Sequence, residues 1–392
     1  MGATVVLSAF DVLQFPQGGG HFSAFLQYVH GLRAQGCEVW WLERLSSCGE
    51  HDADVRKARE LSARLGAAGL PDRLIVYAGE REQERAWLTL EPDEAEAVIA
   101  RADLLLNFFY ELDAEMLARF RRTALVDIDP GLLQMWIAEG ELEVRAHDLH
   151  FTTGETVGTA AAAFPSCGIE WTHIRPPVST EQWPLAREQP ARGFTTVSSW
   201  WSDEWAADGR GGFYDNSKRA SFMDYVELPK RVPVALELSL SVDESEGEDM
   251  EMLRGNGWRV NRASEVTATP AAYHDYVRGS AGEFSCAKPS CMHLQNAWVS
   301  DRTICYLASG RPAVVQDTGP NRYLDGGSGV LRFSTPEEAQ GALEEVHGDY
   351  AHHCAAAREI AVAHFDARKV AGEILDAALG TAARRASQAG VQ

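Results

Sequence analysis

The sequence predicts two α/β domains that face each other across a cleft, each built on a parallel sheet with crossover helices, and a helical C-terminus. The length of 392 residues exceeds what one compact core usually supports. Short β-rich runs alternate with longer amphipathic runs in both halves of the chain. A Pro-rich, mixed polar stretch at 175–193 separates the halves, as an inter-domain linker does.

These observations give a first domain at 1–187, a second at 188–365, and a C-terminal segment at 366–392. The Ala-rich helix of that last segment can cross back to brace the first domain or pack on the second. The sequence leaves both options open. We expect the small, polar residues at the very end to be frayed.

In the first half, β-rich runs are separated by runs of helical periodicity, which favours a parallel sheet with crossover helices. The predicted strands are 4–10, 38–42, 73–77, 104–108, 124–127 and 149–153, and the predicted helices are 23–34, 54–65, 92–102 and 113–120.

The second half repeats this alternation without a visible sequence repeat. Predicted strands are 194–199, 234–238, 258–260, 283–286, 312–316 and 330–333, and predicted helices are 218–227, 248–254, 270–278 and 301–308. From Thr335 onward the pattern is helical, beginning with Pro336 in a first turn behind a capping hydroxyl.

Charge and composition exclude several classes of protein. Hydrophobic residues make up 45% and charged residues 24%, which is ordinary for a globular chain. The formal net charge of -21 disfavours a nucleic-acid partner. No apolar run approaches the roughly 20 residues that cross a bilayer, and the N-terminus lacks a secretory signal pattern. We therefore expect a cytoplasmic protein without a transmembrane segment.

The metal-ligating residue types do not form a convincing site. The seven cysteines are scattered without a Cys-x-x-Cys pair, and Cys286 and Cys291 have only His293 nearby, which is a weak ligand set. The run Asp127-Ile128-Asp129 has the letters of an Asp-x-Asp motif but ends a strand of the first domain. We expect neither a metal nor a bound cofactor.

A glycine-rich turn follows the first strand. Gly18, Gly19, Gly20 and His21 precede a helix, so the backbone can approach a ligand closely and the helix N-terminus can meet an anion or a sugar hydroxyl. The spacing is not the Gly-x-Gly-x-x-Gly of dinucleotide binders. Glu43, near the end of the second strand, keeps a dehydrogenase open as a minor alternative.

The stronger pattern is at 296–319, where a loop, a helix opening at Asp301, a glycine turn, a buried strand and a second loop follow one another. Together with the run Gly18 to His21 and the segment 31–39, it resembles the nucleotide-sugar glycosyltransferases of the GT-B architecture, which have two facing Rossmann-like domains. The likeness covers nearly the whole chain in architecture but only short segments in motif.

This resemblance implies a donor site in the second domain. A carboxylate at Asp301 can accept both ribose hydroxyls, or it can simply cap the helix. Arg302 can clamp a phosphate or pair with an acid. Lys218 and Arg219, at a predicted helix start, would offset the charge of the departing diphosphate, and the turn Thr318-Gly319 would hold the nucleotide. Retaining families place an acidic residue eight positions before the helix acid, where this chain has His293.

The first domain would then hold the acceptor. The resemblance implies that His21 lies near the acceptor and takes a proton from its hydroxyl, whereas helix capping or simple contact is the alternative. Asp127 and Asp129 lie at the carboxyl end of a strand. One of them can orient His21 or hold an acceptor hydroxyl, and a structural turn before Pro130 is the other interpretation.

The sequence therefore predicts a metal-independent glycosyltransferase that uses a nucleoside-diphosphate sugar as co-substrate. It does not identify the acceptor, for which we expect a hydroxyl or amine of a small molecule. Two other functions remain open, a nucleotide-sugar epimerase of the same architecture and a non-catalytic protein that binds sugar nucleotides.

Overall fold

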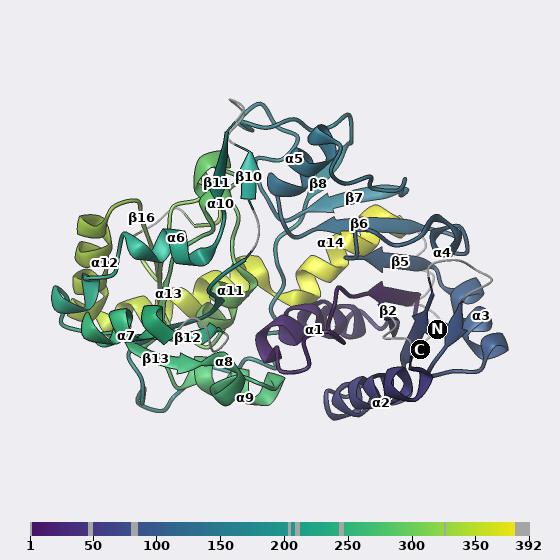
Figure 1. Cartoon of the computed structure of the whole chain (residues 1–392), viewed down its shortest axis with the longest axis horizontal. Helices are drawn as coiled ribbons and strands as arrows, with labels where there is room; N and C mark the ends of the chain where they lie inside the picture. The colour runs from purple at the N-terminus through teal and green to yellow at the C-terminus, as the bar shows by residue number, and fades with distance from the viewer. Residues whose placement is uncertain are drawn as a thin grey trace.

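The computed structural model describes residues 2–45, 50–79, 85–202, 205–207, 212–242, 247–324 and 327–380. The chain forms two α/β lobes side by side (Figure 1). The expected frayed tail beyond residue 380 lies outside the described residues.

The first lobe contains an eight-stranded sheet of order β4-β3-β2-β1-β5-β6-β7-β8, parallel except for the pairing of β3 with β4. Six strands lie where the sequence predicts them, whereas β4 and β8, of two and three residues, are too short to show a pattern. The strands are β1 (Thr4–Ser8), β2 (Glu38–Leu45), β3 (Leu74–Ala78), β4 (Ala86–Trp87), β5 (Leu104–Asn107), β6 (Thr123–Asp127), β7 (Leu149–Thr152) and β8 (Trp171–His173).

Helices cover both faces of this sheet, which is why its strands are apolar along their whole length. In β1, Val5 and Leu7 belong to the core under α1 and α2, while Val6 points to the opposite core under α3 and α4. The helices are α1 (Gly19–Ala34), α2 (His51–Ala67), α3 (Pro92–Arg101), α4 (Ala114–Leu117) and α5 (Leu132–Glu139).

The second lobe has a fully parallel sheet of order β13-β12-β9-β14-β15-β16 and a separate hairpin. The strands are β9 (Phe194–Ser199), β10 (Trp205–Ala207), β11 (Phe213–Asp215), β12 (Leu236–Ser241), β13 (Arg259–Arg262), β14 (Gly282–Ser285), β15 (Ala313–Gln316) and β16 (Val330–Phe333). The helices are α6 (Lys218–Met223), a 3-10 turn (Leu228–Lys230), α7 (Gly247–Gly255), α8 (Ala263–Val266), α9 (Pro270–Arg278), α10 (Pro289–Leu294), α11 (Asp301–Ala308) and α12 (Pro336–Gly348).

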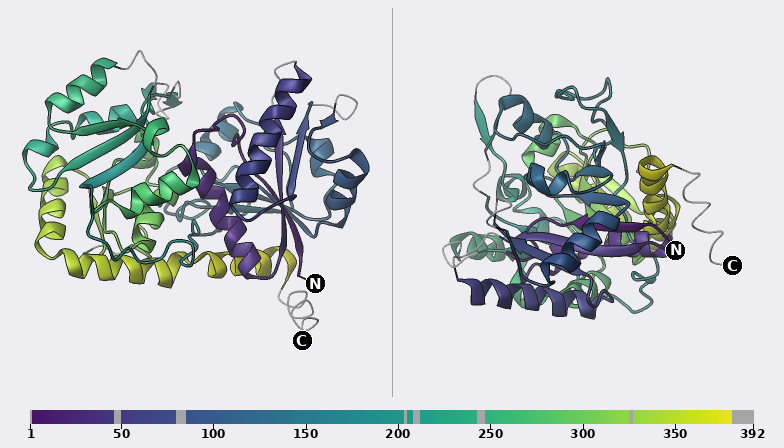
Figure 2. Two further views of the ribbon diagram at one scale, coloured as in Figure 1. Left: turned by 90° about the horizontal axis from the view of Figure 1, so that it is seen from below. Right: turned by 90° about the vertical axis from the view of Figure 1, so that its right-hand side faces the viewer.

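The C-terminal helices run along both lobes (Figure 2, left). Helix α13 (Tyr350–Ile360) packs on α11 of the second lobe, a π-helical turn (Ala361–Phe365) follows, and α14 (Ala367–Leu379) packs on α1 of the first. Residues Val370, Ile374 and Leu375 are part of the first-lobe core. The structure thus selects the crossing-back arrangement.

Glycine is needed where α14 meets α1. A Cβ added to Gly31 would lie 2.3 Å from the carbonyl oxygen of Ala367, so the two helices contact each other through backbone at this position. The outgoing and returning chains also pair beside each other, since Val178 and Asp366 form a parallel bridge. No described helix is long and apolar enough to span a membrane.

Candidate donor and acceptor site

Three cavities follow one another from the strand ends of the second lobe to those of the first. The α11 cavity lies at the ends of β14 and β15 and is lined by Cys286 and Trp298. Trp298 also lines the junction cavity, which Ile128, Asp129 and Lys288 border from both lobes. Those three residues then line the aromatic cavity of the first lobe. The shared lining residues make these cavities neighbours at the carboxyl ends of the parallel strands, where ligands bind in open α/β sheets.

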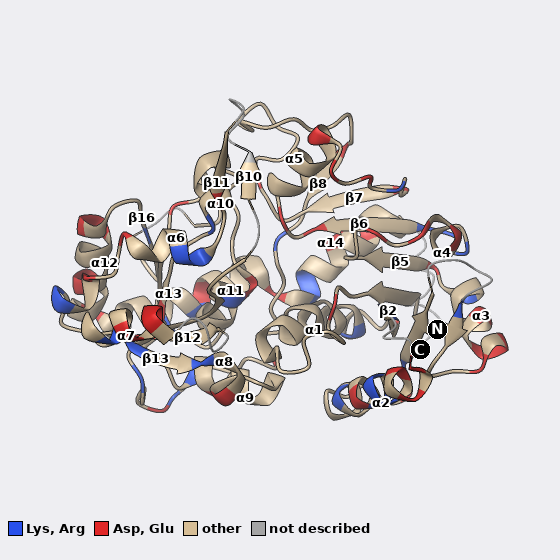
Figure 3. Cartoon of the chain, viewed as in Figure 1, with Lys and Arg blue, Asp and Glu red and all other residues tan. Residues whose placement is uncertain are grey.

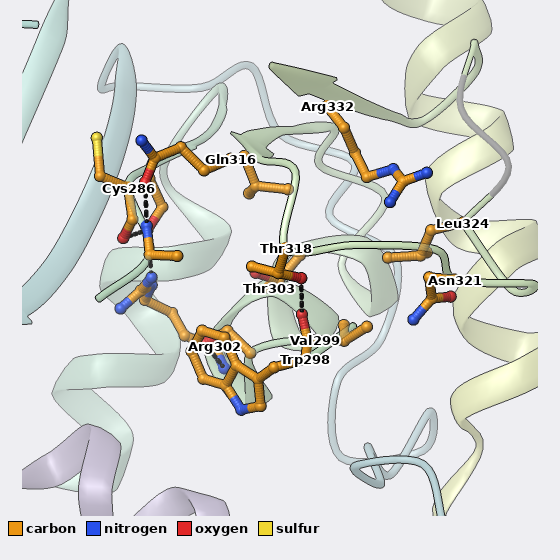
Figure 4. A pocket seen from close by; sticks show the side chains of 14 residues that line it. Cys286, Trp298, Val299, Arg302, Thr303, Gln316, Thr318, Asn321, Leu324 and Arg332 are labelled. Carbon is orange, nitrogen blue, oxygen red and sulfur yellow. Dashed lines mark hydrogen bonds between the residues drawn. The ribbon is translucent and has the colours of Figure 1, made fainter. Parts of the chain in front are cut away.

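The α11 cavity is small, with a volume of about 30 Å³. Ser300 caps α11, its Oγ accepting a hydrogen bond from the backbone N–H of Arg302 at 3.2 Å. Figure 4 shows Trp298, Thr303, Gln316 and Thr318 around the cavity, with the Thr318 hydroxyl bonded to the Trp298 carbonyl at 2.8 Å. A crevice therefore lies in front of this helix, but its volume is that of about one water molecule.

Arg302 is tied into the protein. Its Nε donates to the buried Glu283 at 2.6 Å, and its other nitrogens donate to the Val197 carbonyl and the Ser285 hydroxyl. These bonds occupy three of the five N–H groups of a guanidinium. Of the two roles that the sequence allows, pairing with an acid is the one that the structure shows, although the acid is buried rather than at the surface.

Asp301 does not line the α11 cavity. Burial raises the pKa of this carboxyl, while the charges of Arg302 and His21 lower it. Burial raises the pKa values of Tyr28 in α1 and Tyr273 in α9, and the negative charge of Asp301 raises them further. The carboxylate therefore interacts electrostatically with His21 and with tyrosines of α1 and α9. The sequence predicted a ribose as its partner instead.

Lys218 lines the junction cavity from the start of α6, which is visibly basic in Figure 3. The side chain is 7% exposed, its Nζ donates to the Cys286 carbonyl at 2.5 Å, and it lies 5.7 Å from the centroid of the Trp298 ring. Burial lowers the pKa of Lys218 to about 7, and the positive charge of Arg302 contributes. The amine is therefore poised to take up a proton when an anion arrives.

The other predicted donor residues have different surroundings. Arg219 forms a two-fold ion pair with Asp249 of α7, at 2.6 and 3.1 Å, and stacks on Trp201 with its guanidinium carbon 4.7 Å from the ring centroid. Thr318 lines the α11 cavity. Gly319 has a φ of 120°, and an added Cβ would lie 2.7 Å from the Gln295 carbonyl oxygen. The turn therefore requires glycine, and Arg219 is held away from the cavities.

His21 lies in the first turn of α1, in contact with the rings of Phe10, Phe15 and Phe25. Its Nε2 is 2.6 Å from the Phe10 carbonyl oxygen. Because a carbonyl only accepts, Nε2 carries the proton and Nδ1 carries the lone pair. Burial lowers the pKa of His21, against the opposing effects of the Phe10 hydrogen bond and the charges of Asp301 and Asp11, so the ring is neutral at pH 7.

The glycine turn packs against the second lobe. The Gly19 N–H donates to the Thr267 carbonyl at 3.1 Å, and an added Cβ would lie 2.3 Å from that oxygen. A Cβ on Gly20 would lie 3.1 Å from the Tyr273 ring, whereas one on Gly18 would meet only its own turn. The sequence predicts that the backbone of this turn approaches a ligand closely. In the structure it approaches the residues around the start of α9 instead.

Asp127 and Asp129 differ sharply although only one residue separates them. Asp127 is fully buried and accepts hydrogen bonds from Gln134 at 2.9 Å, Thr152 at 2.8 Å and the Asp129 N–H at 3.0 Å. Burial raises the pKa of Asp127 to about 7. The acids whose charges act on His21 are Asp301 and Asp11, so the structure does not bring Asp127 to that ring.

Asp129, in contrast, lines both the junction and the aromatic cavities and accepts from the Tyr110 hydroxyl at 3.1 Å. Sequence reasoning missed the rest of the aromatic cavity, above all Phe109, Tyr110 and Glu111. Their position directly after β5 was the available signal, because they follow a parallel strand at its carboxyl end.

The structure also bears on two minor alternatives, a dehydrogenase with Glu43 at the ribose and a metal site at Cys286 and Cys291. Glu43 is buried and accepts hydrogen bonds from the Leu13 N–H at 2.6 Å and the Trp41 indole N–H at 3.0 Å. Its carboxylate therefore bonds to the protein itself and not to a ribose. Cys286 and Cys291 are free thiols. Among the described residues, no three His, Cys, Asp or Glu side chains gather as a metal site would require.

Comparison with solved structures extends over almost the entire chain. HepE from Anabaena in complex with UDP and glucose aligns with a TM-score of 0.57 at 11% identity, covering 96% of this chain and 99% of that one. An α-glucosyltransferase in complex with UDP and a 13-mer DNA gives 0.60 at 11%, again with 96% and 99% covered. Sucrose-phosphate synthase from Thermosynechococcus elongatus gives 0.55 at 13%, with 99% and 100% covered.

No protein-family model and no curated protein sequence matches the chain. At these identities the likeness concerns the fold, and it agrees with the sheet orders, the facing strand ends and the returning helix described above. The chain has the two-domain GT-B fold of nucleotide-sugar glycosyltransferases.

Proposed function

We propose that this protein transfers a sugar from a nucleoside-diphosphate sugar to an acceptor hydroxyl or amine. The observation that carries the proposal is the row of three neighbouring cavities, with buried Lys218 at the lobe junction and Asp129 across from it. Solved neighbours of this fold hold UDP or UDP-glucose, which supports the same class of donor here.

The donor's diphosphate binds at the junction cavity. Lys218 and Lys288 offset the negative charge that grows on the leaving nucleoside diphosphate, and this requires no metal ion. The turn at Thr318 and Gly319 and the start of α11 hold the nucleotide. Arg302 supports the site indirectly, because its bonds to Glu283, Val197 and Ser285 fix the strand ends on which the donor lies.

His21 removes the proton from the acceptor. Nδ1 carries the lone pair, and the lowered pKa keeps the ring unprotonated and ready at neutral pH. Asp301 stabilises the imidazolium that forms, since its charge raises the pKa of His21 across the lobe junction. This electrostatic contribution replaces the one that the sequence interpretation gave to Asp127.

Donor binding requires the lobes to open. The α11 and junction cavities measure about 30 and 80 Å³, whereas small-molecule sites span roughly 300–1,000 Å³. We therefore propose that the lobes open and the Trp298 side chain, which lines both cavities, moves aside before the nucleotide binds. Closure after binding excludes water and protects the donor from hydrolysis.

The test is a thermal-shift screen of nucleoside diphosphates and their sugars, followed by a product assay with and without acceptor. A matching ligand at about 100 times its Kd raises the unfolding free energy by roughly 2.7 kcal/mol. Formation of a new sugar nucleotide without acceptor would show an epimerase instead. Binding without any turnover across an acceptor panel would show a non-catalytic protein.

A further inference from the structure

The aromatic cavity is large enough for a second substrate. It measures about 440 Å³, within the roughly 300–1,000 Å³ of small-molecule sites, and Ile128, Asp129 and Lys288 join it to the junction cavity. Phe10 connects it to His21, because the Phe10 ring lines the cavity while the Phe10 carbonyl accepts the His21 hydrogen bond. A molecule held here contacts Phe10, whose carbonyl is hydrogen-bonded to the proposed base, and adjoins the cavity proposed for the leaving group.

The walls of this cavity are flat and apolar. The rings of Phe10 and Phe109 stack with centroids 5.9 Å apart, and the other aromatic lining residues are Phe108, Tyr110 and Trp136. Phe10 is 37% exposed, so its ring is accessible to a ligand in the cavity. Such walls bind a ring face by stacking.

The rim of the cavity is acidic. Glu111, Asp129 and Glu141 line it together with one cation, Lys288. Burial raises the pKa of neighbouring Asp11, the charges of His21 and Arg44 oppose this, and the charge of Glu111 adds to it. Arg44 lies 4.7 Å from the centroid of the Phe109 ring. Of the four charged side chains that line the cavity, three are acids and one is a base, and Asp129 and Lys288 also line the junction cavity. This balance repels a phosphate and attracts an ammonium group, which aromatic faces also bind.

We propose that the acceptor is a small, unphosphorylated molecule that carries an amine and has one flat apolar face, with Glu111, Glu141 and Trp136 as its specificity residues. The proposal rests on the transferase function proposed above and names its acceptor class. It separates this chain from a neighbour whose name includes a sugar phosphate and from one bound to DNA.

The experiment measures binding of three probes by calorimetry, with UDP present at saturation. The probes are phenyl glucoside, its 2-amino-2-deoxy analogue and its 6-phosphate, which differ in one substituent. We expect the amine to bind about fivefold more tightly than the neutral probe, and the phosphate about fivefold more weakly. Equal affinities for all three, or a preference for the phosphate, would overturn the proposal.

Two variants assign the preference to residues. In the Glu111→Gln, Glu141→Gln double variant, the amine and neutral probes should bind alike. Glu143→Gln is the matched control, because Glu143 is exposed and pairs with Arg145 outside the cavity. Trp136→Ala should weaken all three probes by up to about tenfold, while an unchanged UDP affinity verifies its fold.

The outcomes distinguish this proposal from the function on which it rests. A protein that binds UDP-sugar and slowly hydrolyses it, but binds none of the probes, retains the proposed donor chemistry and loses the acceptor class. A protein that binds the amine probe in the expected order, but no nucleotide, keeps the cavity's specificity and loses the transferase function.

Discussion

Replacing Lys218 with methionine should stabilise the protein while weakening its donor binding. The amine is 7% exposed, and burial lowers its pKa from 10.5 to about 7. In the unfolded chain the amine regains its ordinary pKa, so between pH 7 and 10.5 the unfolded state binds more protons than the folded state. The burial of the amine therefore costs nothing above pH 10.5, and the free energy of unfolding falls as the pH decreases toward 7.

The magnitude follows from the two pKa values. At ~1.36 kcal/mol per pKa unit, the buried amine costs about 4 kcal/mol at pH 7 and about 1 kcal/mol at pH 9.5. The variant also loses the hydrogen bond to the Cys286 carbonyl, worth about 1 kcal/mol, although that carbonyl keeps the Ser285 hydroxyl at 3.3 Å. The net expectation is a gain of about 3 kcal/mol at pH 7 that largely disappears at pH 9.5.

The assay is urea unfolding of wild type and Lys218→Met at both pH values. Lys230→Met serves as the control, because Lys230 is exposed and its amine donates to Asn256 at the surface. A variant that is less stable than wild type at pH 7, or shifted equally at both pH values, would refute the reasoning. UDP affinity should fall about 10- to 100-fold, as expected for losing one charged hydrogen bond.

Three further predictions concern the lobe contacts and the base. His21→Gln, which can still donate to the Phe10 carbonyl, should slow sugar transfer by about 10²–10⁴ with UDP affinity unchanged, and a full rate would exclude His21 as the base. Since burial lowers the pKa of His21 from its usual 6.5, the wild-type rate should fall to half its plateau only below pH 6.5, and a half-maximal rate above pH 6.5 would contradict the assignment. Gly19→Ala should lower the unfolding free energy by about 1–3 kcal/mol because its Cβ meets the Thr267 carbonyl, whereas Gly66→Ala, with nothing within 4 Å, should be neutral or slightly stabilising.

The architecture could be predicted because most strands and helices have a recognisable pattern of apolar residues in their own sequence. Strands such as β9 and β16 and helices such as α9 and α11 lie at the predicted bounds, since each has its own periodicity and its own start signal. Helix α5 was missed because its sequence, Leu-Leu-Gln-Met-Trp-Ile-Ala-Glu, is apolar on most sides and shows no helical stripe.

The site was less predictable because its partners are distant in sequence. The helix starts that carry Arg219 and Arg302 are where the sequence predicts them, but Asp249 and Glu283 lie 30 and 19 residues away and leave no local sign. The same holds for Gly19, whose neighbour Thr267 belongs to the other lobe. The residue types of these segments showed that they bind a partner closely. They could not show whether that partner is a ligand or another part of the protein.

The returning helix α14 makes the first lobe discontinuous in sequence. Its core is complete only when the last described helix has been synthesised, so the second lobe is made before the first can finish folding. The two crossings between the lobes also lie side by side, where Val178 pairs with Asp366. Because the two crossings are hydrogen-bonded to each other, neither can move at this point without the other, which couples the outgoing and returning chains in any motion of the lobes.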